Sequence, residues 1–143
     1  MQTFDPVREI QGSELILEAN GQWPNFHDAD VHSINFWRGD IRPDENVWVP
    51  PMIDAHLELT ALEKPFLAVL RFHGCDGVEM SGFHHCNQID DLTFSFQERD
   101  SPSDAATPLS QRVRVEFAQG FGVSLRFTCL RVEVRERRDV KPK

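Results

Sequence analysis

Histidine and carboxylate side chains gather at two places where the sequence could support chemistry. The first holds His27, Asp28, Asp30 and His32 within six residues, and the second is the run His84–His85–Cys86. Imidazole, carboxylate and thiolate groups are the ligands that zinc and iron take. Each histidine pair is an odd number of residues apart, so in a regular strand its members would face opposite sides. We therefore expect these histidines to hydrogen-bond the backbone of turns, and we predict no metal and no cofactor.

Motifs of other catalytic classes are missing from the sequence. There is no GxSxG nucleophile elbow, no GxxxxGK[ST] phosphate loop and no GxGxxG motif after a predicted strand. Cys75, Cys86 and Cys129 form no CxxC pair, and we expect buried, unreactive thiols. We predict that the protein is not an enzyme and has no catalytic residues. A metal-dependent hydrolase that uses His27, Asp28, His32, His84 and His85 stays open as an alternative.

Charge is distributed unevenly along the 143 residues, whose net charge is −8. Residues 1–100 hold 6 basic and 18 acidic side chains. Phosphate repels such a segment, so neither nucleic acid nor a membrane surface is expected as a partner, whereas a basic protein fits. The residues expected to bind this partner are carboxylates of predicted loops and strand ends, namely Asp40, Asp44, Glu45, Asp76, Glu79, Asp90 and Asp91.

The later basic residues are expected to have partners inside the protein. Alternation places them on the exposed face of the last strands, where they could pair with Asp54 or Glu58. They are Arg112, Arg114, Arg126, Arg131 and Arg135.

Length and composition predict a single domain over residues 1–143 that needs neither disulfides nor a structural metal. No stretch approaches 18 consecutive apolar residues, and four acidic residues lie among the first twenty, where a signal peptide needs a basic start and an apolar centre. We expect a soluble, cytoplasmic protein and leave its oligomeric state open.

Alternating apolar and polar residues predict a mostly β fold. The alternation changes at Cys129–Leu130, which indicates a β-bulge in one long last strand or, alternatively, a corner followed by a fresh strand. Residues 113–128 predict a hairpin around Gly120–Gly122. Strands are expected near Val31–Trp37, Ile53–Leu59, Ala68–Phe72, Val78–Met80, Leu92–Phe96, Val113–Phe117 and Val123–Val134.

The remaining segments are predicted to be a helix, loops and a tail. Ser13 is expected to cap one short helix over residues 14–19, which Asn20–Gly21 ends. Proline-rich residues 40–51 predict a loop, 98–111 a mobile loop and 138–143 a loose C-terminal tail. The predicted fold is α+β and mostly β, with six to eight largely antiparallel strands. A curved sheet, an open barrel and a sandwich remain equally open.

Three segments resemble the immunity protein 50 family, small proteins of bacterial polymorphic toxin systems. The distinctive one is Trp23–Ser33, which matches the family's signature of tryptophan, proline and phenylalanine-histidine-aspartate-alanine-acid-valine. Residues 70–87 resemble the family's central strands and turn, and residues 113–129 its closing hairpin. The likeness covers roughly residues 14–134. Asp30 departs from it, because a glutamate is usual there.

The resemblance implies a non-enzymatic protein that binds and neutralises a cognate toxin of the same bacterium. The signature residues are expected to be structural and to hold the helix against the sheet, and they are Trp23, Phe26, His27, Asp28 and Asp30. The alternative from a different class is a small-ligand-binding β domain, in which phenylalanines would line an apolar pocket.

Overall fold

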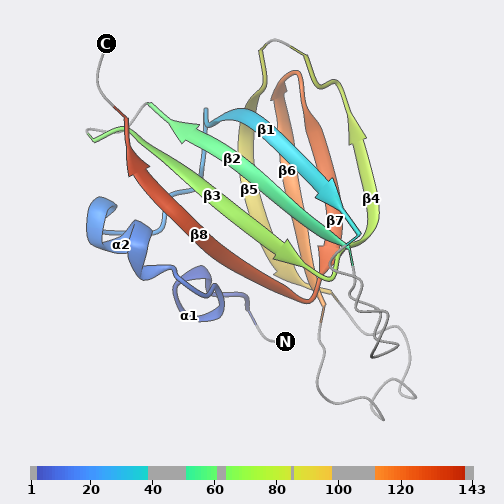
Figure 1. The fold of residues 1–143 in the computed structure, drawn as a ribbon, viewed down its shortest axis with the longest axis horizontal. Coiled ribbons are helices and arrows are strands. Elements are labelled where there is room, and N and C mark those ends of the chain that lie inside the picture. The colour runs from blue at the N-terminus through green and yellow to red at the C-terminus, as the bar shows by residue number, and fades with distance from the viewer. Residues whose placement is uncertain (1–2, 39–50, 61–63, 85, 98–111, 141–143) are drawn as a thin grey trace.

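A computed structural model describes residues 3–38, 51–60, 64–84, 86–97 and 112–140 of the chain. Two short helices at the N-terminus precede eight strands (Figure 1). The elements are α1 (Pro6–Glu9), α2 (Glu14–Asn20), β1 (Asp30–Trp37), β2 (Met52–Leu59), β3 (Phe66–His73), β4 (Asp76–Ser81), β5 (Gln88–Phe96), β6 (Val113–Phe121), β7 (Ser124–Cys129) and β8 (Arg131–Asp139).

The strands form one open antiparallel sheet in the order β4-β7-β6-β5-β1-β2-β3-β8. The pairing at its centre is short: among the described residues, β1 pairs with β5 at Asp30 and Gln88. The sheet curves so that its halves face each other, and the ring of Phe72 on β3 contacts Phe117 on β6 and Phe127 on β7, with centroids 6.1 and 5.0 Å apart. Of the three predicted architectures, the structure has the single curved sheet.

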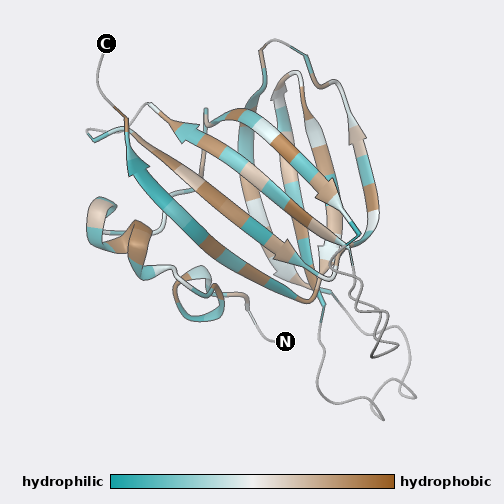
Figure 2. Cartoon of the chain, viewed as in Figure 1, coloured by the Kyte–Doolittle hydropathy of each residue, from teal (hydrophilic) through white to brown (hydrophobic). Residues whose placement is uncertain are grey.

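The core lies between the two halves and explains the alternation of the sequence. Val113, Val115 and Phe117 of β6 are buried, while the intervening Arg114 and Glu116 are exposed. Figure 2 shows this alternation as brown and teal bands along the strands, whereas β3 is brown over most of its length. Burying a phenylalanine contributes about 1.5–3 kcal/mol. Phe66, Phe72, Phe117 and Phe127 are buried in this core, and Phe94 and Phe96 pack against it while partly exposed.

β7 and β8 are separate strands with only Leu130 between them. β7 pairs with β6 and β4, whereas β8 pairs with β3. The change of alternation at Cys129–Leu130 therefore marks a corner followed by a fresh strand. The bulge in one long strand was the wrong interpretation. Gly74, with φ +70°, turns the chain between β3 and β4 at the same level as Leu130.

The N-terminal segment contains the expected α2 and an additional helix, α1. Four residues are too short to show helical periodicity, but α1 has Pro6 in its first turn and the Asp5 carboxylate accepts a hydrogen bond from the amide of Val7. We expected the Ser13 side chain to cap α2, but Ser13 at the N-cap position makes no side-chain hydrogen bond to the helix. Its hydroxyl instead donates to the carbonyl oxygen of Val7 at 2.7 Å, which joins the two helices.

The same segment covers part of the β8 edge. The amide of Gln11 donates to the carbonyl of Val132 at 3.1 Å, and its carbonyl accepts from the amide of Val134 at 2.7 Å. Phe4 stacks on Phe94 of β5, with ring centroids 5.5 Å apart. The N-terminal segment thus contacts both halves of the sheet.

The predicted C-terminal tail and two predicted loops lie partly or wholly outside the described residues. β8 continues to Asp139, so residues 138 and 139 of the predicted tail belong to a strand, while 141–143 lie outside the described residues. The predicted loop 98–111 and residues 40–50, which include Asp40, Asp44 and Glu45, also lie outside them. None of the described helices is long and apolar enough to cross a membrane.

Candidate functional site

The two edges of the sheet differ in what covers them. On β8, seven of nine residues are charged, and Gln11 occupies part of its backbone edge. On β4, all six residues are exposed, and among the described residues no strand pairs with its outer side. Val78 and Met80 leave 41% and 45% of their surface exposed. An open edge with unpaired amides and carbonyls is a template for another strand.

Local features of the sequence hold β4 in place. It pairs with β7 from Asp76, opposite Thr128, to Ser81, opposite Ser124, with an irregularity after Asp76. Gly82 ends the strand at φ +75°, and a Cβ atom there would collide with the carbonyl oxygen of Gly122. The close approach of these two turns therefore requires glycine.

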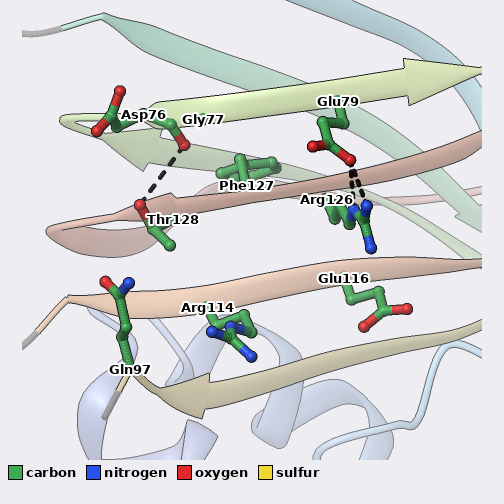
Figure 3. A pocket seen from close by; sticks show the side chains of 9 residues that line it. All are labelled: Asp76, Gly77, Glu79, Gln97, Arg114, Glu116, Arg126, Phe127 and Thr128. Atoms are coloured by element: carbon green, nitrogen blue, oxygen red, sulfur yellow. Dashed lines mark hydrogen bonds and ion pairs between the residues drawn. The ribbon is translucent and has the colours of Figure 1, made fainter. Parts of the chain in front are cut away.

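A polar groove of about 440 Å³ lies across β4, β7 and β6 beside this open edge (Figure 3). In Figure 3, the Arg126 side chain reaches from β7 towards Glu79 on β4, and the Arg126 Nε atom lies 2.6 Å from Oε2 of Glu79. The groove is lined by Asp76, Gly77, Glu79, Gln97, Arg114, Glu116, Arg126, Phe127 and Thr128.

The groove offers hydrogen-bonding groups of both charges. Arg114 and Glu116 are exposed on β6, and neither has an ion pair with any residue that the structure describes. Asp76 is likewise exposed at the start of β4. Mixed charges beside an unpaired strand edge suit a peptide segment, whose backbone and side chains offer both donors and acceptors.

The predicted partner-binding residues fall in separate places. Asp76 and Glu79 lie together on β4, at the groove. Asp90 and Asp91 lie on β5, and two strands separate β5 from β4. Glu79 pairs with Arg126, whose partner was predicted to be Asp54 or Glu58.

The arginine partners predicted for the last strands also differ. Asp54 forms a two-pronged ion pair with Arg71, with both N–O distances 2.9 Å, and Glu58 pairs with His32. Arg131 instead contacts His73, and Arg112 donates to backbone carbonyls. Arg131 contacts His73 and not a residue of β2, because β8 lies beside β3 and not beside β2.

The signature segment packs on β5, so the prediction that it holds the helix against the sheet is wrong. Phe26 is fully buried, and Trp23 is half-buried with its ring centroid 5.7 Å from that of Phe26 and 6.3 Å from that of Phe94. The amide of Asp28 donates to the carbonyl of Ile89 at 3.0 Å. The segment thus packs on β5, whereas α2 lies against β8 (Figure 1).

His27 joins the signature to the predicted carboxylates of β5. Its Nδ1 atom lies 2.7 Å from the backbone oxygen of Asp90, and its Nε2 atom lies 3.5 Å from a carboxylate oxygen of Asp28. The hydrogen bond to the Asp90 backbone, and then the charge of Asp28, raise the pKa of His27. The predicted backbone hydrogen bond is present, but its partner is a distant strand and not the turn itself.

His32 belongs to a different cluster, with Asp30 and Glu58. Its Nε2 atom pairs with Glu58 and lies 3.9 Å from a carboxylate oxygen of Asp30. These are the described residues that could hold a metal, because their ligand atoms all lie within 4.8 Å of one another. The sequence did not predict Glu58 as a member of this cluster, because the pairing of β1 with β2 is what brings it opposite Asp30.

The second histidine cluster is a hydrogen-bonded turn. The amide of His84 donates to the Asn87 side-chain oxygen at 2.8 Å, and the amide of Cys86 donates to Nδ1 of His84 at 3.2 Å. The buried Asn87 side chain donates in return to the His84 carbonyl. His84 therefore stabilises backbone, as predicted, while His85 lies outside the described residues.

Comparison with known proteins gives no match to this chain. No family model matches it, and neither a curated protein nor a solved structure is significantly similar. The resemblance to the immunity protein 50 family therefore stays a prediction.

Proposed function

We propose that this protein is a non-enzymatic inhibitor that binds and neutralises a basic bacterial toxin protein, and that the toxin docks on the β4 edge and the adjoining groove. The observation that supports this site best is the open edge of β4, where all six residues are exposed. The identity of the partner class comes from the resemblance to the immunity protein 50 family.

The composition of β4 suits the addition of a partner strand. A protein normally protects an edge strand with charges, proline or a covering segment, and β8 has charges and Gln11. β4 also has two charged residues, Asp76 and Glu79, but it exposes Val78 and Met80 as well, which are two residues apart and so face the same side of the strand. In strand addition, backbone hydrogen bonds provide affinity, and side chains at such spacing provide specificity.

Charge favours a basic partner over other proteins. The chain has a net charge of −8, and a field of this sign steers a basic protein towards it before contact. A toxin that cleaves nucleic acid must itself be basic to hold phosphate. Occupying that surface with an acidic protein would block its substrate.

The experiment uses the toxic domain of the cognate toxin that the resemblance implies, which would be sought first in the gene next to this one. We would co-express it with the wild-type protein and with a Val78→Lys/Met80→Lys variant, and measure growth and the affinity of the purified pair. Two lysines at an edge disfavour strand addition and repel a basic partner, so growth protection should fall and affinity should drop by about thirtyfold or more.

The matched control is Leu15→Lys, because Leu15 is an apolar residue on α2 with 40% of its surface exposed, far from β4 in the chain. It should protect as the wild type does. Failure of the wild-type protein to bind or protect would overturn the proposed function. Normal binding by the double variant would instead move the site away from β4.

A further inference from the structure

Two buried cysteines, Cys75 and Cys129, lie at the corner of the sheet where β3 leads to β4 and β7 leads to β8. In the paired strands, His73 is opposite Arg131 and Asp76 is opposite Thr128. Cys75 lies between β3 and β4, and Cys129 is the last residue of β7, so these two pairings bring the cysteines to the same corner although they are far apart in the sequence. The two segments of backbone approach closely there, since a Cβ atom added at Gly74 would lie 2.8 Å from the Leu130 side chain.

Both thiols point into the same core and share a neighbouring cation. Cys75 and Cys129 are 4% and 0% exposed and belong to one cluster of packed residues. The Arg112 guanidinium donates to the carbonyl of Gly74 at 2.7 Å and to that of Thr128 at 3.3 Å. These are the residues that precede the two cysteines, so one side chain fixes both segments of backbone.

The two cysteines lie close to each other at this corner. The amide of Cys75 donates to the carbonyl of Pro51 at 2.8 Å, and its thiol donates to the carbonyl of Phe72 at 3.3 Å. Cys75 lies near enough to Cys129 to raise the pKa of that thiol. A disulfide between them requires Cα atoms about 4.4–6.8 Å apart.

We propose that Cys75 and Cys129 are a redox pair that forms a reversible disulfide across this corner, joining the β3–β4 connection to the β7–β8 connection. The oxidant is a small disulfide such as oxidised glutathione. One cysteine thiolate attacks it and forms a mixed disulfide, releasing one thiol. The other cysteine then displaces the second thiol, so two cysteine thiols and one disulfide become one protein disulfide and two small thiols.

Burial makes this reaction slow in the folded protein. It raises the pKa of Cys75 and that of Cys129 to about 12 each, and the nearby Cys75 adds to the effect on Cys129. Few thiolates are present near neutral pH, and the thiolate is the reacting form. We therefore expect the bond to form as the corner closes during folding, when both sulfurs are still accessible.

The test starts from a Cys86→Ser variant, because Cys86 is exposed, where the sequence predicted a buried thiol, and could exchange with either partner. The reduced, unfolded variant is refolded in a buffer of reduced and oxidised glutathione. Intact mass and a count of free thiols after denaturation then show whether the two cysteines are joined. Urea unfolding is measured on the same sample with and without dithiothreitol.

We expect the refolded variant to lose two hydrogen atoms and both free thiols, and its urea midpoint to fall when dithiothreitol is added. A Cys75→Ala/Cys86→Ser variant should form no intramolecular bond, and its midpoint should not respond to the reductant. Two outcomes would overturn the proposal. One is a folded protein that keeps both thiols free in this buffer, and the other is a bond whose formation lowers the urea midpoint.

Discussion

Arg126 on β7 pairs with Glu79 on the edge strand β4, with Nε 2.6 Å from Oε2, although 47 residues separate them in the sequence. The two side chains are 66% and 64% exposed, so solvent screens the pair and it contributes about 0–1 kcal/mol to folding. Its place at the open edge matters more than its strength. A partner strand added to β4 would pass Glu79 on one face of the strand and Val78 and Met80 on the other.

Glu79→Gln should separate folding from binding. We expect the free energy of unfolding to fall by less than about 1 kcal/mol, while association with the toxin domain slows and depends less on salt. Chemical denaturation and stopped-flow mixing measure these quantities. The control is Glu136→Gln, which removes a partner of Arg138 on β8. Equal slowing by both variants would indicate a general charge effect and no site at β4.

The signature should stabilise the fold through Phe26 more than through Trp23. Phe26 is fully buried, so Phe26→Ala should cost about 3–5 kcal/mol. Trp23 is only half-buried, so Trp23→Ala should cost less. Phe83→Ala, at a residue 46% exposed, should change stability little. Urea denaturation of the three variants tests this order, and a larger loss for Trp23→Ala than for Phe26→Ala would refute it.

Glu133 should make part of the stability depend on pH in acid. Burial opposes its ionisation, but the hydrogen bond from His73 and the charge of Arg135 outweigh that effect and lower its pKa from the ordinary 4.5. A lowered pKa stabilises the folded state above pH 4.5, and this contribution is lost as the pH falls through the folded-state value. The stability difference between wild type and Glu133→Gln should therefore shrink below pH 4.5, as measured by denaturation at several pH values. A constant difference would show that the carboxylate charge does not contribute.

Protein purified without added metal should contain no stoichiometric zinc or iron. His32 already pairs with Glu58, so a metal would have to displace an existing contact. Elemental analysis of the wild type checks this. His32→Ala and His27→Ala are matched variants, because His27 also lies between two carboxylates but outside the convergent cluster. A metal-to-protein ratio near one that falls only in His32→Ala would contradict the prediction.

The strands could be predicted because their evidence is local. The alternation of Ile53, Ala55 and Leu57 with polar residues reports one buried face, and it needs no knowledge of neighbouring strands. The helix α2 could be predicted because Gly21 ends it at φ 82°. The helix α1 was missed, since four residues do not complete a periodic pattern.

The site could be predicted only in part, because it depends on which strands become neighbours. Asp76 and Glu79 were identified as acidic residues near a turn, but their position on an edge strand follows from the order of the whole sheet. The Arg126 partner of Glu79 follows from the pairing of β4 with β7. Ion pairs between residues that are far apart in the sequence produce no periodic pattern from which they could be predicted.

Amide hydrogen exchange on the purified complex is the most direct measurement of the central claim. Free and toxin-bound protein would be compared at residues 76–81, with β8 as the internal reference. A partner strand added to β4 would occupy its outward-facing amides, so we predict slower exchange in β4 on binding and little change in β8. Unchanged exchange in β4, together with new protection elsewhere in a complex that still forms, would contradict docking on this edge.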